Sequence, residues 1–412
     1  MNPIDFNNDL PPEQRQLREQ THRFAAEVMR PASLELDALS PEDVIAPASR
    51  LRDVFREAYK AGYHLRGFPP ELGGAGLDPM DAWVVGEEFG WGSSGLSISL
   101  GVTSMPFRFA AMTGNPDLMR EVVMPFVEDT EGRLIGCWCA TEPQHGSDAI
   151  LYSGERSRPD IHFECMARLD GDEWVINGQK SAWVSNGTIA THTLGFFCVE
   201  QSQGMAGTGV AVVPLDLPGV SRGKPLNKLG QRALNQGEIF FDNVRIPRHY
   251  MLTGPGSFGG PATDLLLAQA NAGMSATFCG VARAAFEEAL TYTQNRVQGG
   301  VPISQHQLVQ KKLFDMFVKV ETARQISRAT LVYNQGQFPP GTVYSITSKV
   351  YCTQAAFEVA SDAIQIHGGM GLTKELLVEM LFRDARASMI EDGSNDILSL
   401  TAAKKIIDTY AP

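Results

Sequence analysis

Two adjacent carboxylates near the C-terminus, Glu391 and Asp392, have the residue types of a general base. They stand directly before a Gly-Ser-Asn turn (393–395), and the turn leads into a helical pattern of apolar residues that begins at Ile397. Glycine allows backbone conformations that other residues avoid, Ser or Asn caps a helix, and the free N–H groups of the first helical turn attract negative charge. The stretch 383–397 therefore predicts a positioned base, an anion site, or both.

An acidic, solvated turn before a surface helix would contain the same residues, so this stretch alone leaves that interpretation open. The remaining elements decide whether a binding cleft forms around the two carboxylates.

The chain divides by pattern into a helical region, a strand-rich region and a second helical region. The expected helices, read from apolar residues at helical spacing, cover 12–64 with a Pro/Ser-rich break at 41–47, then 80–90, 263–294, 306–335 and 343–367. Between 134 and 247, short β-branched or aromatic runs punctuated by Gly, Asn and Asp predict strands, among them Glu173–Ser185 and Glu238–Ile246. We expect three domains: residues 1–133 (α-helical), 134–250 (β) and 251–412 (α-helical).

Three local signals add detail to this outline. Asn177-Gly178 lies between two strand-like runs and predicts a tight hairpin turn. The polar segment 150–161 predicts a surface loop. The glycines that follow His367 predict a helix end at which a ligand can approach the backbone, although helix C-caps use glycine routinely.

The composition is that of an ordinary globular protein of more than one core, with 412 residues of which 43% are hydrophobic. A net charge of −12 argues against nucleic acid or an anionic membrane as the main partner. The six cysteines form no C-x-x-C pair, which predicts reduced thiols, a cytoplasmic location and no zinc or other metal site. The acidic N-terminus is unlike a signal or transit peptide, and no apolar run approaches membrane-spanning length.

Several strings, taken in order, resemble the acyl-CoA dehydrogenase family of flavoproteins over about residues 17–407. Trp138–Asp148 reads WCATEPQHGSD, similar to the family signature T-E-P-x-x-G-S-D, and 176–187 (INGQKSAWVSNG) looks like its second signature. Lys228–Pro247 resembles the strand that closes the β domain, and the segments starting at Gln365 and Arg383 resemble the C-terminal blocks. The resemblance implies an α+β fold with an N-terminal helical domain, a middle antiparallel β domain and a C-terminal four-helix-bundle domain.

The resemblance also implies FAD as the cofactor. Thr141 and Ser185 would donate to the edge of the flavin ring, Trp183 would pack on the ring, and Ser147 would lie near the pyrophosphate or the CoA tail. Donors at the ring edge stabilise the negative charge that develops as a flavin accepts a hydride. Further implied FAD contacts are Trp138, Ser394 and Asp396.

In this family FAD bridges subunits, so the resemblance implies a homodimer or homotetramer. Arg296 would pair with the pyrophosphate through two charge-assisted hydrogen bonds, and Gln307 would contact the adenosine side. The backbone against which a neighbouring subunit's FAD lies would come from Gln365, Gly368 and Gly369. The implied partners are an acyl-CoA substrate and an electron-transfer flavoprotein as electron acceptor.

The implied reaction is α,β-dehydrogenation of an acyl-CoA thioester in fatty acid or acyl-CoA catabolism: a base removes the α-proton while the β-hydride goes to flavin N5. Where the family commonly reads Tyr-Glu-Gly-Thr, this chain reads Glu-Asp-Gly-Ser, so Asp392 stands at the position of the catalytic Glu. Aspartate reaches roughly 1.5 Å less far than glutamate, and proton transfer needs about 2.6–3.2 Å between heavy atoms. Asp392 is the expected base and Glu391 the fallback.

Two features leave the substrate open. In the helix after the β domain, Ala268 and Asn271 stand where many relatives have an Asp and an Arg that contact CoA. The alternative function is a flavin oxidase or monooxygenase of the same fold that acts on a non-CoA or carrier-protein-bound substrate. A third interpretation is a non-enzymatic or nucleic-acid-binding relative, which the acidic net charge disfavours. Small residues over 93–97 suggest room for a branched or cyclic acyl group.

Overall fold

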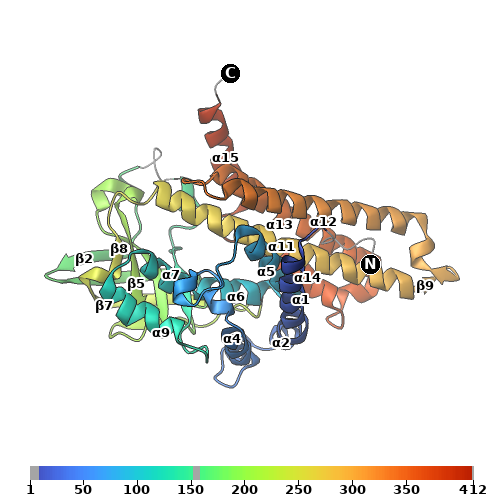
Figure 1. The fold of residues 1–412 in the computed structure, drawn as a ribbon, viewed down its shortest axis with the longest axis horizontal. Helices are drawn as coiled ribbons and strands as arrows, with labels where there is room; N and C mark the ends of the chain where they lie inside the picture. The colour runs from blue at the N-terminus through green and yellow to red at the C-terminus, as the bar shows by residue number, and fades with distance from the viewer. Residues whose placement is uncertain (1–8, 152–157, 411–412) are drawn as a thin grey trace.

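A computed structural model describes residues 9–151 and 158–410, and its chain runs from a helical region through a sheet to a helical bundle (Figure 1). The central part of the expected surface loop, residues 152–157, lies outside the described residues. The N-terminal α-helices are α1 (Pro12–Phe24), α2 (Arg30–Asp37), α3 (Pro41–Val44), α4 (Arg50–Lys60), α5 (Pro79–Gly92), α6 (Ser94–Thr103), α7 (Met105–Met112), α8 (Pro116–Leu118) and α9 (Met124–Val127).

Capping side chains fix where the N-terminal helices begin. α5 starts after Asp78, whose carboxylate accepts a hydrogen bond from the Asp81 N–H at 2.7 Å, and Pro79 occupies the first helical position. The expected break at 41–47 is partly wrong, because Ser40 caps the short helix α3 by accepting from the Asp43 N–H at 3.1 Å.

The described strands of the middle region form one eight-stranded sheet in the order β6-β7-β3-β2-β4-β5-β8, with β1 beside β4. Their bounds are β1 (Gly136–Cys139), β2 (Met166–Asp170), β3 (Glu173–Ser185), β4 (His192–Cys198), β5 (Thr208–Pro214), β6 (Val220–Arg222), β7 (Gln236–Pro247) and β8 (Met251–Thr253). The sheet is mostly antiparallel as expected, but β1 and β2 each pair with β4 in parallel. Parallel pairing is possible here because long connections separate these strands in the chain.

The hairpin turn predicted at Asn177-Gly178 is wrong. β3 runs straight through both residues, and its register against β7 shifts between Ile176 and Gly178, which is a β-bulge. The real turn that joins β2 to β3 lies at Gly171-Asp172, between the paired residues Asp170 and Glu173. At Gly178, with φ +133°, a Cβ atom would come within 2.7 Å of the Cys165 Cα, so this glycine serves close backbone approach instead of chain reversal.

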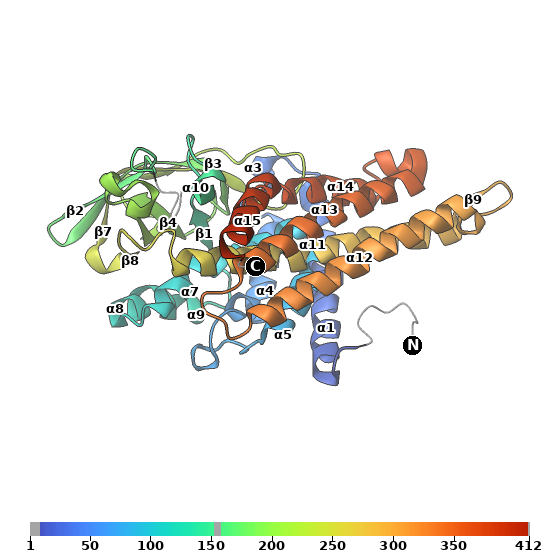
Figure 2. The ribbon, with the colours of Figure 1, turned by 90° about the horizontal axis from the view of Figure 1, so that it is seen from above.

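The C-terminal region contains the long helices that the apolar periodicity predicts. They are α11 (Pro261–Asn295), α12 (Gln307–Asn334) and α13 (Thr342–His367), followed by the 3₁₀ turn η9 (Gly368–Leu372), α14 (Leu377–Ser388) and α15 (Asn395–Thr409). α11, α12, α13 and α14 pack together as a bundle, and a small hairpin of β9 (Val297–Gln298) and β10 (Val301–Pro302) lies at its end far from the sheet (Figures 1 and 2).

The expectation that no segment is apolar and long enough to cross a membrane needs correction. Within α11, residues Thr263–Asn295 meet that criterion by length and composition. In the structure, 67% of the most apolar stretch is buried among the other helices, so α11 has the character of a central core helix.

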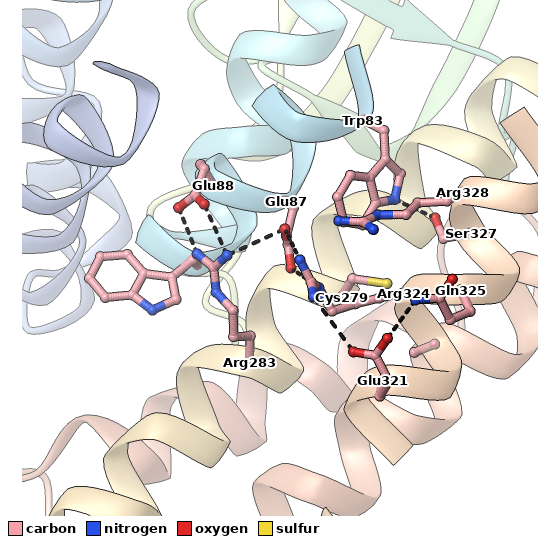
Figure 3. Close-up of polar contacts among 12 residues, drawn as sticks. Trp83, Glu87, Glu88, Cys279, Arg283, Glu321, Arg324, Gln325, Ser327 and Arg328 are labelled. Carbon is pink, nitrogen blue, oxygen red and sulfur yellow. Dashed lines mark hydrogen bonds and ion pairs between the residues drawn. The ribbon is translucent and has the colours of Figure 1, made fainter. Parts of the chain in front are cut away.

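A buried network of charges ties α5 to the bundle (Figure 3). The Arg324 Nε on α12 donates to Glu87 at 2.6 Å, and Arg283 on α11 makes two hydrogen bonds with Glu88, at 2.6 and 2.9 Å. Burial works to raise the pKa of Glu88, but the Arg283 charge and the His22 hydrogen bond hold it lowered, at about 2. Because each buried charge has a partner, the network joins the first and third regions without an unpaired ion.

Candidate functional site

A large cavity lies where α6, the sheet and the C-terminal helices meet. Its volume is about 1940 Å³, well above the roughly 300–1,000 Å³ of an ordinary small-molecule site. A cavity of this size has room for a large cofactor and a substrate side by side. Both carboxylates of the opening motif, Glu391 and Asp392, line it.

The turn that carries these carboxylates has an unusual backbone held by several hydrogen bonds. Asp392 has φ +51° and Gly393 has φ +91°, and a left-handed conformation is uncommon for aspartate. The Ser394 N–H donates to the Ser147 Oγ at 2.9 Å, and the Asn395 N–H donates to the Met389 carbonyl at 2.9 Å. Ser394 caps α15 by accepting from the Ile397 N–H at 3.4 Å, so the predicted helix start is confirmed.

The two carboxylates have different surroundings. Burial and then the negative charge of Asp392 raise the pKa of Glu391 to about 7, and the Gln231 Nε2 donates to Glu391 at 2.5 Å. Asp392 is accessible from the cavity, yet protein surrounds it on most sides; this burial raises its pKa, while the positive charge of Lys349 works to lower it. A carboxyl whose pKa lies above the usual range is a better base near neutral pH.

Residues to which the sequence interpretation gave no role of their own lie around this pair. Lys349 on α13 donates to the Gly393 carbonyl at 2.8 Å, and Lys228, in the segment before β7, donates to the Leu234 carbonyl at 2.7 Å. Burial lowers the pKa of both lysines to about 8. Asp384 on α14 accepts from the Gln231 N–H at 2.5 Å, and burial raises the pKa of Asp384 to about 6.

One sequence signal marked Lys349 in advance. It stands three residues after Ile346 and three before Cys352, on a helix face whose i−4 and i+4 neighbours, Ser345 and Thr353, are small, and all four are buried. A lysine on such a face is rarely buried without a specific partner, so its position was informative. Gln231 has no signal from periodicity, although it lies in the block Lys228–Pro247 that resembles the family.

The β-domain residues assigned to the flavin line the same cavity: Trp138, Thr141, Ser147, Trp183 and Ser185. The Ser185 Oγ accepts from the Gln236 Nε2 at 3.2 Å, which leaves its own proton free to donate towards the cavity. Trp183 is 57% exposed, an unusual fraction for an indole unless a ring or another chain covers it. Free hydroxyl donors beside a bare indole fit an isoalloxazine ring.

The other assigned residues do not line this cavity. Arg296 and Gln307 lie at the ends of α11 and α12 by the β9–β10 hairpin, at the far end of the molecule (Figure 2). A tilted ring contact between Tyr292 and His367, with centroids 4.1 Å apart, brings the end of α13 to the same place. That end carries Gln365, Gly368 and Gly369; Ser394 and Asp396, at the start of α15, are also absent from the cavity lining. The predicted contacts of these residues with FAD stay predictions.

The small residues of 93–97 do not line the cavity, so the suggestion of extra room for a bulky acyl group loses its basis. Ser94 donates to Asp384 at 2.8 Å, and the Ser97 and Thr277 hydroxyls lie 3.2 Å apart. These residues serve close packing of α6. On α11, Ala268 and Asn271 are buried and likewise absent from the lining.

Comparison with known proteins covers almost the whole chain. The family models described as acyl-CoA dehydrogenase N-terminal, middle and C-terminal domains match residues 11–129, 137–244 and 262–407. The mitochondrial short-chain specific acyl-CoA dehydrogenase of Rattus norvegicus is 31% identical over 404 residues, which span 98% of this chain and 92% of that protein.

Solved structures agree on the fold. The butyryl-CoA dehydrogenase of Megasphaera elsdenii superposes with a TM-score of 0.84 at 25% identity, covering 97% of this chain and 99% of that one. The prolyl acyl carrier protein oxidase AnaB has a TM-score of 0.83 at 24% identity, over 96% of this chain and 99% of that one, and shows the fold alone. With three domain models in order, this chain belongs to the acyl-CoA dehydrogenase family of FAD-dependent enzymes.

Proposed function

We propose that this chain catalyses α,β-dehydrogenation of an acyl-CoA thioester with Asp392 as the base. The single observation that supports this best is that Asp392 lines the same cavity as Thr141, Trp183 and Ser185. A base and a set of flavin-type donors around one space allow a substrate to lie between them.

In the proposed mechanism Asp392 takes the α-proton of the acyl group. FAD bound in this cavity would supply the acceptor for the hydride that leaves the β-carbon. Thr141 and Ser185 would donate hydrogen bonds to the flavin where negative charge develops, and Trp183 would pack against it. Burial raises the pKa of Asp392, which makes the proton transfer more favourable near neutral pH.

The left-handed backbone at Asp392 bears on the reach of the shorter side chain. A turn with φ +51° directs the side chain differently from extended or helical backbone, so the main chain can compensate for the missing methylene. The hydrogen bonds of Ser394 and Asn395 hold that turn in place.

Asp392→Asn tests the proposal. Replacing the base by an amide should lower the rate of flavin reduction by the best acyl-CoA substrate at least about 10³-fold, while bound FAD stays unchanged. Glu391→Gln, measured beside it, should keep most of the activity. The proposal fails if Asp392→Asn reduces its flavin at the wild-type rate; activity lost only in Glu391→Gln would move the base to the neighbouring carboxylate.

A second candidate is a flavin oxidase of the same fold acting on a carrier-protein-bound substrate. The observation that favours it is on α11, where neither Ala268 nor Asn271 offers a charge to the cavity for a CoA tail. A screen of acyl-CoA thioesters of varied chain shape, with electron-transfer flavoprotein or an artificial acceptor, separates the two. Reduction by acyl-CoA with slow reoxidation in air supports the dehydrogenase, and rapid reoxidation with no response to acyl-CoA supports the oxidase.

A further inference from the structure

Lys349 is a fully buried ammonium without a carboxylate in direct contact. Its Nζ donates to the Gly393 carbonyl at 2.8 Å and to the Asn395 Oδ1 at 2.9 Å. Among the described residues, no ion pair joins Lys349 to an Asp or Glu. Burying a charge against neutral partners is costly, so its presence on α13 calls for a compensating interaction.

Both partners of Lys349 belong to the turn that carries the proposed base. Gly393 follows Asp392 directly, and the two share positive φ angles. The Asn395 side chain also donates to the Thr353 Oγ1 on α13 at 3.0 Å, so the turn is tied to that helix at two points. A hydrogen bond to the carbonyl next to Asp392 limits how far the carboxylate can move.

The charge of Lys349 acts on the same carboxylate. Burial lowers the pKa of Lys349, and the Asp392 and Glu391 charges are the groups that work to raise it again. In return the Lys349 charge lowers the pKa of Asp392 against the effect of burial. Other charged groups near the turn are Lys228 in the segment before β7, Asp384 and Arg386 on α14, and Asp396, Lys404 and Lys405 on α15.

We propose that Lys349 is the positioning residue of the base: its ammonium holds the Asp392-Gly393 turn and keeps the Asp392 carboxyl ionised inside the cavity. This inference rests on the proposed function, in which Asp392 removes the α-proton. An aspartate base needs such support more than a glutamate does, because its shorter side chain has less freedom to find the substrate.

Three substitutions separate the charge from the hydrogen bond. Lys349→Gln keeps a donor and loses the charge, Lys349→Met loses both, and Lys349→Arg keeps both in another shape. Lys312→Gln is the matched control, because Lys312 pairs with Asp362 at 2.7 Å and does not line the cavity. The readout is kcat/KM for an acyl-CoA substrate against pH, with the melting temperature of each variant.

The positive charge favours the ionised form of Asp392, so its loss should shift the acidic limb of the profile to higher pH. We expect a shift of about one pH unit in Lys349→Gln and Lys349→Met, with Lys349→Arg near wild type and Lys312→Gln unchanged. Lys349→Met should in addition lose about ten- to a hundredfold in kcat because the turn is no longer held. Independently of turnover, the ¹³C carboxyl resonance of Asp392, assigned with Asp392→Asn, should titrate at a higher pH in Lys349→Gln.

Failure of this inference differs from failure of the proposed function. If Asp392→Asn is inactive but the acidic limb and the carboxyl titration stay at the wild-type pH in Lys349→Gln and Lys349→Met, Lys349 is only structural and the inference is wrong. If Asp392→Asn keeps wild-type activity, the proposed function itself is wrong. Should Lys349→Met fail to fold, Lys349→Gln and Lys349→Arg carry the test, since both keep a donor for the Gly393 carbonyl.

Discussion

At the scale of single residues, the neighbouring carboxylates Glu391 and Asp392 have different surroundings because their hydrogen-bond and charge partners differ. Glu391 is held by Gln231, which is itself fixed through its backbone N–H to Asp384. Within residues 9–151 and 158–410, no side chain donates a hydrogen bond to Asp392, which is accessible from the cavity and near the buried charge of Lys349. We therefore propose Asp392 as the base and Glu391 as a neighbour that is held in place. The sequence around two adjacent residues is nearly the same, so only these tertiary contacts distinguish them.

The raised pKa of Glu391 makes a prediction about stability. Its pKa rises from the usual 4.5 to about 7 on folding, so between these values the folded protein keeps a proton that the unfolded chain has released. This stabilising contribution is complete below pH 4.5 and is lost as the pH rises through 7. Glu391→Gln, which stays neutral, should therefore be about 1–3 kcal/mol more stable than wild type at pH 8 and similar at pH 4.5.

Thermal unfolding at several pH values measures this difference. Glu35→Gln, the same exchange at an exposed carboxylate on α2 that does not line the cavity, serves as the matched control and should follow the wild-type curve. A difference between Glu391→Gln and wild type that stays constant from pH 4.5 to 8 would contradict the assigned titration.

At the scale of elements, the Asn177-Gly178 bulge shows how a strong local signal can serve another purpose. The Asn177 Oδ1 accepts from the Asn243 N–H at 2.8 Å, across to β7, where Asn243 also has a positive φ of 52°. A dipeptide that usually reverses the chain here lies inside a long strand, opposite the extra residue that β7 holds between Phe241 and Val244. The continuous β3 then reaches Trp183 and Ser185, which line the cavity.

Two glycines of this hairpin give a matched pair of substitutions. Gly178→Ala would bring a Cβ to 2.7 Å from the Cys165 backbone at φ +133°, so it should destabilise the protein by roughly 2–4 kcal/mol. Gly171→Ala, at φ +63° with no atom within 4 Å, should cost only about 1 kcal/mol. Melting temperatures and FAD content of both variants check this, and equal losses would show that backbone strain alone, without the close approach, decides the cost.

At the scale of the whole molecule, the residues assigned to FAD, apart from Ser394 and Asp396 at the start of α15, fall into two groups at opposite ends. One group lines the cavity beside the sheet, and the other gathers around the β9–β10 hairpin (Figure 1). Within one subunit the second group does not line the cavity. The family expectation that FAD bridges subunits would bring the groups together, and we propose a homo-oligomer on that basis.

Mixed oligomers test the bridging arrangement. Arg296→Ala should lose FAD, Asp392→Asn should bind FAD without turnover, and each homo-oligomer should fall below about 1% of wild-type activity. Co-expression should restore activity, because a subunit with intact Asp392 can pair with a partner that supplies an intact Arg296. Turnover and bound flavin after co-purification are the measurements, and inactive mixed oligomers would place the whole FAD site within one subunit.

The sequence by itself determined the order of helical, strand-rich and helical regions, the long C-terminal helices, the capped turn before α15 and the family. These are local properties: apolar periodicity, capping residues and short motifs are complete within a few turns or one strand. The candidate carboxylates at 391 and 392 are also predictable from local sequence, because five consecutive residues form the turn that carries them.

The tertiary structure alone decided which groups act on those carboxylates. Lys349 meets Gly393 from 44 residues away in the chain, and Gln231 meets Glu391 from 160 residues away. The same holds for the buried pair of Glu87 and Arg324, which are 237 residues apart. Local periodicity carries no information about such pairs, since the side chain that neutralises or positions a buried charge is chosen by packing between domains.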